Sequence, residues 1–199
     1  RKPTSELQKL PPTMFRDELA AAVAKAISAG RSVLLVGASG IGKTSVLHGF
    51  AGHLTKMGPR KLYELSTIQL LSGTVYLGEW QSKVTAIIDQ AAKARAVLFF
   101  SDIWNLRSAG RSSSSTDTVW DALRPRLQAG DVQIIGEVDE AQLLDLNTLP
   151  GFTGPFDIIE VPPLSADQVG SVVQAEAGRL ALQIDAPAAG RLLELCNQF

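Results

Sequence analysis

The sequence is poor in cysteine and has no excess of either charge. Cys196 is its single cysteine, so no disulfide can form within the chain, as is usual in a reducing compartment. The 19 lysine and arginine residues nearly balance the 20 aspartate and glutamate residues, which leaves a net charge of -1. Proteins that bind nucleic acid or membrane surfaces through charge normally carry a basic excess. We therefore expect no nucleic-acid partner.

Long hydrophobic runs are also missing. The longest compact apolar run covers residues 96–100, whereas a membrane-spanning helix needs roughly 18 residues or more. We expect no membrane association and a cytoplasmic location. The chain starts at Arg1 rather than methionine and stops at Phe199 inside a predicted helix. We therefore expect it to be a piece of a longer protein, so the lack of a signal peptide says little.

Short apolar runs alternate with helical segments along most of the chain. The runs with the length and composition of buried strands are residues 32–36, 61–65, 96–101, 132–136 and 157–161. The segments with helical composition are residues 15–29, 42–57, 84–94 and 118–128. This alternation predicts an α/β domain of three layers, in which helices cover both faces of a five-stranded parallel sheet.

One glycine-rich segment matches the phosphate-loop pattern G-x-x-x-x-G-K-[ST] at every fixed position. It consists of Gly37, Ala38, Ser39, Gly40, Ile41, Gly42, Lys43 and Thr44. Glycines let the backbone wrap closely around phosphates, and the helix that follows points its positive end at them. Lys43 supplies a positive charge, and the Thr44 hydroxyl can coordinate Mg²⁺. Together with the next residue, Ser45, this segment predicts a site for ATP with Mg²⁺.

The pattern changes after the proline pair at residues 162–163. Residues 165–182 and 186–197 both have helical composition, with no strand between them. Ser165 and Gln168 have the spacing of a capping box, which starts a helix. We predict a phosphate-loop domain over residues 1–162 and a small helical subdomain over residues 163–199, which is truncated at its end.

Two more segments have a pattern that a known family shares. Residues 14–19 resemble the box I-G-R-[DE]-x-E-[LI], with Phe15 at the glycine position, and residues 71–80 are similar to A-G-x-x-[YF]-x-G-[ED]-[FW]. With the phosphate loop and the element order, they resemble AAA+ ATPases, and more narrowly the first nucleotide-binding domain of Clp-type unfoldases and disaggregases. In that family the first box lies by the adenine.

The resemblance implies several further properties. In the family, the aromatic residue of the second segment faces the pore of a hexamer and moves a polypeptide. Tyr76 is then the pore-loop residue, a polypeptide is the substrate, and the parent protein forms a ring, most simply a hexamer. Residues 163–199 become the helical lid of the nucleotide site. We expect the isolated chain to be a monomer.

The acidic pair that the family carries after its third strand is incomplete here. In one register, residues 97–100 are the strand, Ser101 takes the place of the Mg²⁺-binding acid, and Asp102 takes the place of the catalytic base. In the other register, Asp102 is the Mg²⁺-side acid and Ile103 replaces the base. One carboxylate is lost in both registers. An aspartate at a strand end can also be a plain helix cap or turn residue.

The end of the fourth predicted strand departs from the family as well. The family has G-[AST]-[TN]-[TN], with a polar side chain that senses the γ-phosphate, where this chain has Gly136, Glu137, Val138 and Asp139. Val138 cannot form such a hydrogen bond. Glu137 and Asp139 would repel phosphate unless their side chains point away.

The arginine finger of the family is also missing. Gly154, Pro155 and Phe156 stand where the family has Arg-Arg-Phe, and no arginine lies between Arg126 and Arg179. We predict the ATP-binding domain of a Clp-like remodelling machine with weak or absent hydrolysis. The alternative is a non-hydrolysing regulatory or scaffold module, in which ATP is a structural ligand for ring assembly. Whether the chain is an active ATPase stays open.

Overall fold

The computed structural model of the chain describes residues 13–73, 79–112, 115–185, 188 and 190–192. Tyr76 and Cys196 lie outside the described residues, as does most of the helix predicted over residues 186–197. Among the described residues, none of the helices has the length and apolar character that crossing a membrane requires.

A five-stranded sheet forms the centre of the molecule. Its strands are β1 (Ser32–Val36), β2 (Leu62–Leu65), β3 (Val97–Phe100), β4 (Gln133–Val138) and β5 (Phe156–Glu160). Their order across the sheet is β2-β3-β4-β1-β5, and every neighbouring pair is parallel. The predicted five-stranded parallel sheet is confirmed. The fourth strand, however, continues two residues beyond the predicted end at Gly136, as far as Val138.

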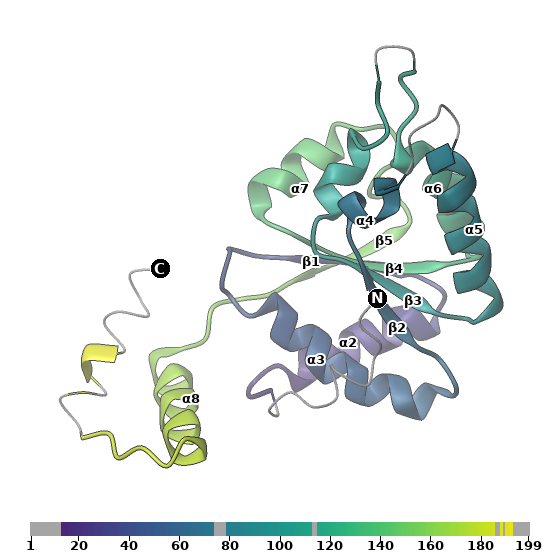
Figure 1. Cartoon of the computed structure of the whole chain (residues 1–199). Helices are drawn as coiled ribbons and strands as arrows, with labels where there is room; N and C mark the ends of the chain where they lie inside the picture. Colours follow the sequence, from purple (N-terminus) through teal and green to yellow (C-terminus); the bar gives the residue numbers. More distant parts are fainter. Residues whose placement is uncertain (1–12, 74–78, 113–114, 186–187, 189, 193–199) are drawn as a thin grey trace.

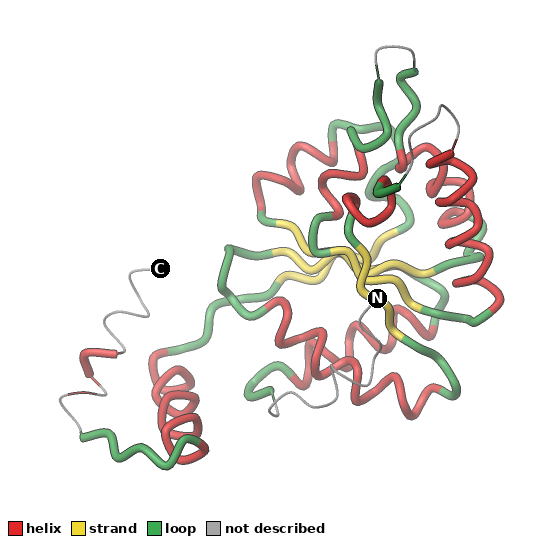
Figure 2. The backbone as a smooth tube through the Cα atoms, viewed as in Figure 1, coloured by secondary structure: helices red, strands yellow, loops and turns green. Residues whose placement is uncertain are grey.

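Helices cover both faces of this sheet, so the domain has the three predicted layers (Figures 1 and 2). One face carries α2 (Asp17–Ser28) and α3 (Lys43–Leu54). Helix α3 continues into the 3₁₀ turn η1 (Thr55–Met57). The elements on the other face are α4 (Thr67–Leu71), α5 (Glu79–Lys93), η2 (Ile103–Arg107), α6 (Val119–Gln128) and α7 (Glu140–Asn147). The sequence patterns missed α4 and α7, which are short and begin directly after strands.

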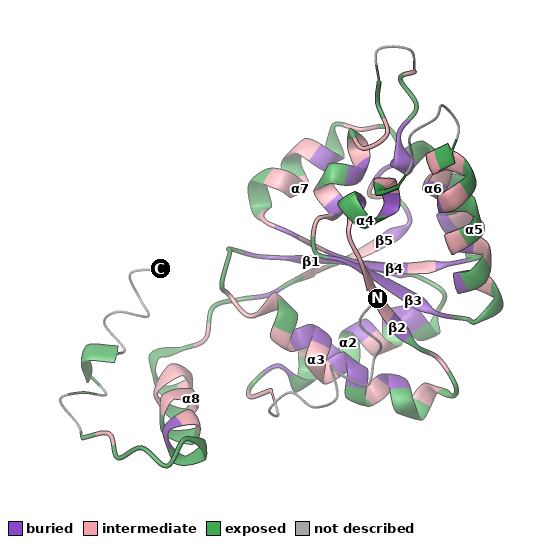
Figure 3. Ribbon diagram, viewed as in Figure 1, coloured by how far each residue is buried: buried purple, intermediate pink, exposed green. Residues whose placement is uncertain are grey.

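Successive side chains of each inner strand point alternately into two apolar cores, one on each face of the sheet. On β1, Val33 and Leu35 pack with α2 and α3, while Leu34 and Val36 pack with the helices of the opposite face. All five residues of β1 are buried (Figure 3), as expected for the inner strand of a parallel sheet covered on both sides. Because successive side chains point to opposite faces, this alternation also fixes where residues at the strand ends point.

Helix α8 (Ala166–Arg179) follows the sheet domain and lies apart from it in Figure 1. Ser165 accepts a hydrogen bond from the N–H of Gln168 at 3.3 Å, and the Gln168 side chain accepts from Ser165 N–H at 2.9 Å. The predicted capping box is therefore present. The domain boundary at residues 162–163 and the lid role of the C-terminal segment stay predictions.

Candidate nucleotide-binding site

The phosphate loop begins directly after β1, and its first residue contacts the neighbouring strands. The N–H of Gly37 donates to the carbonyl oxygen of Val138 on β4 at 3.1 Å. A Cβ atom at Gly37 would lie 2.9 Å from the carbonyl oxygen of Val161 and 3.1 Å from the Ile41 side chain. Only glycine fits at this position without moving the backbone, which explains why the first glycine of the pattern is needed here.

The loop ends at Gly42, whose φ of +99° is a left-handed conformation that favours glycine. This turn directs the chain into α3, and the N–H of Val46 closes the first helical turn on the carbonyl oxygen of Gly42 at 3.2 Å. The first turn of α3 carries no acidic residue. The positive end of the helix therefore faces the loop without a competing carboxylate from its own first turn.

Lys43 and Thr44, the first two residues of α3, carry the chemistry of the loop. The Lys43 ammonium donates to the carbonyl oxygens of Gly37 at 2.6 Å and Ala38 at 2.9 Å. The Thr44 hydroxyl donates to the carboxylate of Glu137 at 3.1 Å. The lysine thus bends back over the loop, and the threonine hydroxyl lies against a carboxylate from β4.

Arg16 supports the loop from behind. Its guanidinium donates to the carbonyl oxygen of Ile41 within the loop at 2.7 Å and to that of Pro162 after β5 at 2.9 Å. The residue is only 4% exposed. The preceding Phe15 has a φ of +59°, so the backbone keeps a conformation that suits glycine at the place where the resembling box has one. The sequence placed this box near the adenine but did not reveal that Arg16 holds the loop.

The end of β3 separates the two candidate acid positions. β3 ends at Phe100, and Ser101 lines the hollow beside the loop together with Lys43. Asp102 is engaged elsewhere: its carboxylate accepts from the Thr67 N–H at 3.0 Å and from the Thr67 hydroxyl at 2.5 Å. The Asp102 carboxylate thus binds Thr67, the first residue of α4, whose own N-cap is Ser66.

The end of β4 holds an acid inside the site. Glu137 accepts from Thr44, and it also lines the hollow with Lys43 and Ser101. Burial raises the pKa of Glu137, and the nearby Glu64 adds to this, while the hydrogen bond from Thr44 and the charge of Lys43 act in the opposite direction. Glu137 therefore does not point away from the phosphate site.

The neighbours of Glu137 have other uses. Val138 is buried in the core. Asp139 accepts from the N–H of Gln142 at 2.7 Å and, with the Gln142 side chain, forms the capping box that begins α7. The sequence had grouped Asp139 with Glu137 as a source of repulsion, but the Asp139 carboxylate is committed to a helix start. The Asp-x-x-Gln spacing of residues 139–142 could have predicted this helix start. It was overlooked because the segment was compared with the family's phosphate-sensing residues.

The hollow beside the loop has a volume of about 210 Å³. Its lining consists of Ser39, Lys43, Ser101, Glu137, Val138, Asp139 and Gln142. Within the described part of the chain, no group of three or more His, Cys, Asp or Glu side chains could hold a metal ion by itself. Mg²⁺ usually binds through one or two protein ligands together with phosphate oxygens and water. The Thr44 hydroxyl and the Glu137 carboxylate, both hard oxygen ligands, fit that requirement.

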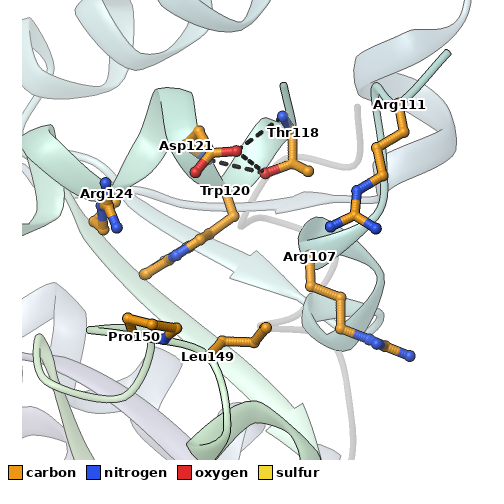
Figure 4. Close-up of a pocket in the computed structure, with 8 residues that line it drawn as sticks. All are labelled: Arg107, Arg111, Thr118, Trp120, Asp121, Arg124, Leu149 and Pro150. Atoms are coloured by element: carbon orange, nitrogen blue, oxygen red, sulfur yellow. Dashed lines mark hydrogen bonds between the residues drawn. The ribbon is translucent and has the colours of Figure 1, made fainter. Parts of the chain in front are cut away.

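A second hollow, of about 160 Å³, lies beside α6 and is lined by none of the loop residues. Figure 4 shows the three arginines that border it, Arg107, Arg111 and Arg124, around the indole of Trp120. Arg107 stacks on Trp104 at 3.9 Å and pairs with Asp145 at 3.3 Å. At least this arginine is already engaged within the fold.

Another arginine contacts the segment in which the arginine finger is missing. Arg31, just before β1, donates to the carbonyl oxygens of Gly154 at 3.1 Å and Phe156 at 3.2 Å, and it pairs with Asp157 at 2.9 Å. An arginine from another part of the sequence thus contacts Gly154 and the first two residues of β5. Its three bonds tie it to its own chain, and no pattern in the sequence indicated this placement.

Comparison with known proteins identifies the family of this chain. The family model described as "ATPase family associated with various cellular activities (AAA)" matches residues 33–149, which is more than half of the chain and includes the phosphate loop. This chain belongs to the AAA family. Membership implies nucleotide binding and confirms the predicted α/β phosphate-loop fold.

Relatives and solved structures of the Clp type are similar to this AAA domain. ClpB of Dichelobacter nodosus is 32% identical over 111 residues, which are 52% of this chain and 13% of that protein. ClpB of Meiothermus ruber is 24% identical over 180 residues, 85% of this chain and 21% of that protein.

Two Hsp104 structures share the fold. One, a closed state with ATPγS and FITC casein, has a TM-score of 0.77 and 22% identity over 88% of this chain and 31% of that chain. The S. cerevisiae Hsp104–casein complex in an extended conformation has a TM-score of 0.76 and 21% identity, and the match covers 89% of this chain and 32% of that one. The resemblance to Clp-type AAA+ proteins is confirmed. The chain spans less than a third of the length of these relatives.

Proposed function

We propose that this chain is the ATP-binding domain of a Clp-like protein-remodelling machine and that it hydrolyses ATP slowly or not at all. The observation that carries the proposal is the hollow in which the phosphate loop, the start of α3 and the ends of β3 and β4 meet. A loop of this geometry at a helix start is a binding site for phosphates. Membership of the AAA family supports ATP as the nucleotide.

The parts of the site divide the work of binding. Residues 37–42 direct the loop backbone around the phosphates, and the adjacent Lys43 ammonium balances their charge. Thr44 holds Mg²⁺ by its hydroxyl, and Ser45 follows it in the first turn of α3. When bound there, Mg²⁺ would supply positive charge to the phosphates. Arg16 keeps Ile41 in place, so the loop is organised before the nucleotide arrives.

Slow hydrolysis follows from the position of the acids. A general base must reach the attacking water within hydrogen-bond distance, but the Asp102 carboxylate is held by Thr67 at the start of α4. Ser101, which does line the hollow, has no carboxylate. Loss of a general base typically costs roughly 10²–10⁴-fold in rate. The segment before β5 offers no arginine of its own, which would weaken activation between subunits.

The remodelling role rests on the relatives. The Hsp104 structures contain casein, a polypeptide, and the matched ClpB proteins are named chaperones. We extend this to a polypeptide substrate, a ring such as a hexamer in the parent protein, and Tyr76 as the pore-loop residue. The cytoplasmic location stays a prediction.

A regulatory or scaffold module is the second candidate. In such a module ATP binds at the same site and stabilises contacts between subunits without turnover. The observation that favours it is the pair of hydrogen bonds from Thr67 to the Asp102 carboxylate. These bonds hold the acid that follows Ser101 at the start of α4, away from the hollow. The two candidates differ in turnover by the assembled ring, not in binding.

Calorimetry of ATP binding in the presence of Mg²⁺, with a phosphate-release assay on the same sample, tests the proposal. We expect binding by the 199-residue chain with little or no release. Lys43→Ala should weaken binding by at least about 30-fold, because loss of one partner of a close charge pair costs roughly 2–5 kcal/mol and 1.4 kcal/mol is about tenfold.

Two results would contradict the proposal. Binding that Lys43→Ala leaves unchanged would place the nucleotide elsewhere. Rapid phosphate release that depends on Lys43 would show that Asp102, or another group, is an adequate base. Release only by the assembled parent ring would favour the remodelling machine over the scaffold.

A further inference from the structure

The side chain of Glu137 has no role in the standard arrangement of a phosphate-loop site, in which the cation-side acid follows β3. Strand alternation explains why it enters the site. Ile135 packs in the core on the α2–α3 face, while Ile134 and Val138 pack on the opposite face. Glu137 is therefore directed to the face of α3, where the carboxylate meets Thr44. The position of this acid follows from the pleat of β4.

The sheet register places Glu137 next to the position where the acid is missing. Phe100 on β3 pairs with Gly136 on β4, so the following residues, Ser101 and Glu137, lie beside each other on neighbouring strands. Both line the same hollow. Adjacent strands lie about 4.8 Å apart, and glutamate is one methylene longer than aspartate. A carboxylate can thus be supplied to the same place from the next strand.

We propose that Glu137 is the Mg²⁺-binding carboxylate of this site and replaces the acid that is absent at Ser101. This inference rests on the proposed binding of ATP with Mg²⁺. The carboxylate oxygen lies 3.1 Å from the Thr44 hydroxyl oxygen. Two neighbouring ligands of an octahedral Mg²⁺, with bonds of about 2.1 Å at right angles, lie about 3 Å apart. The two side chains are thus spaced as ligands of one cation.

The charges around Glu137 support the same role. A half-buried carboxylate that faces phosphate groups would repel them strongly in surroundings of low dielectric constant. Lys43 is the nearby positive charge, and Glu64 adds a second negative one. A divalent cation between the acid and the phosphates converts the repulsion into attraction. Glu137 should therefore weaken the binding of metal-free nucleotide and strengthen the binding of nucleotide with Mg²⁺.

A purely structural role for Glu137 makes a different prediction. If the carboxylate only anchored Thr44, Glu137→Gln would keep the hydrogen bond through the amide oxygen and change both forms of binding little. The metal role requires opposite changes with and without Mg²⁺. These opposite signs separate the two explanations.

The experiment measures ATP affinity by calorimetry, once in EDTA and once with excess Mg²⁺, for the wild-type chain, Glu137→Gln and Asp139→Asn. Asp139→Asn is the matched control, because it makes the same acid-to-amide change in the same hollow and keeps an oxygen for the α7 cap. In Glu137→Gln we expect tighter binding in EDTA, because the repulsion between the carboxylate and the phosphates is removed. The gain on adding Mg²⁺ should fall by roughly 10–100-fold, the usual effect of losing a metal-site group. Asp139→Asn should keep the wild-type gain.

A second measurement avoids ATP altogether. Mn²⁺ binding to the chain with ADP, followed by electron paramagnetic resonance, should be weakened in Glu137→Gln and normal in Asp139→Asn. The proposal is overturned if Glu137→Gln keeps the full Mg²⁺ and Mn²⁺ effects, or if Asp102→Asn loses them instead. Failure of the wild-type chain to bind ATP in either condition would refute the proposed function, which is a distinct outcome.

Discussion

The phosphate loop and the ends of β3 and β4 border the same hollow but differ in how they depend on the sequence. The loop works mainly through its backbone. Gly37 is required because a side chain would collide with Val161, and Gly42 because its φ is positive. At the strand ends the chemistry belongs to side chains. There Ser101 has no acid, and Glu137 on the next strand has one.

This contrast shows which parts of a site can be recognised from the sequence. A backbone cradle depends on several consecutive residues, so its sequence pattern stays recognisable. A carboxylate is needed only at one point in space, and parallel strands in register offer more than one position from which to reach it. The loop was therefore visible from its motif, whereas the acid was not.

Exchange of the two side chains is the strongest test of this contrast. Glu137→Ser should lose the Mg²⁺-dependent gain in ATP affinity by roughly 10–100-fold. Adding Ser101→Asp to that variant should recover most of the loss, because the carboxylate then reaches the cation from β3. The coupling is measured by calorimetry as a double-mutant cycle. Independent effects of the two substitutions would show that Ser101 and Glu137 are not alternative positions for the same carboxylate.

Arg16 tests whether the loop depends on support from outside its motif. Arg16→Met keeps a long apolar stem but removes the donors to Ile41 and Pro162. We expect the free energy of unfolding to fall by about 2–3 kcal/mol, since hydrogen bonds from a charged group contribute about 1.5–3 kcal/mol. ATP affinity should fall as well, by up to about 10-fold or 1.4 kcal/mol.

Denaturant unfolding and calorimetry measure these two effects of Arg16→Met. Arg16→Lys, which keeps the charge but not the two-pronged geometry, should lie between the wild type and Arg16→Met. Unchanged stability in Arg16→Met would show that the loop backbone organises itself without this support.

The pH dependence of stability gives the smallest expected effect. Burial and Glu64 raise the pKa of Glu137 in the folded chain, against Thr44 and Lys43, which act in the opposite direction. The folded state therefore holds this proton more tightly than the unfolded state. Its contribution to stability is complete below the ordinary glutamate pKa and is lost as the pH rises through the raised value. Glu137→Gln has no such titration.

Without nucleotide, Glu137→Gln should therefore melt at a higher temperature than the wild type near pH 7. The difference should narrow as the pH falls toward about 4, the ordinary range for glutamate. Thermal melts at several pH values measure it. A wild-type advantage near pH 7 would mean that the hydrogen bond from Thr44 and the charge of Lys43 outweigh the burial of the carboxylate.

Most of the fold could be predicted from the sequence because its signals are local and strong. Apolar runs such as Val97–Phe100 have the length of buried strands, and Ser165 with Gln168 marks the start of α8. Helices α4 and α7 were missed because they are short. Their capping boxes lie at Ser66 and Asp139, where the strands end.

The site was predictable only in part. The loop residues follow from one motif, and the structure places them together at the start of α3. The contacts of Asp102 with Thr67 and of Thr44 with Glu137 join residues 35 and 93 positions apart in the chain. Such contacts depend on the strand order and register, which no pattern within a single segment reveals.

The strand order has a consequence for where a metal-binding acid can be placed in such a domain. β4 lies between β1, which carries the phosphate loop, and β3, which ends at the usual acid position. A residue at the end of this middle strand is within reach of both. Glu137 has this position, and its carboxylate lines the hollow together with Lys43 of α3 and Ser101 after β3. If Glu137 binds Mg²⁺ as proposed, a domain without an acid after β3 still has a complete set of metal-binding side chains.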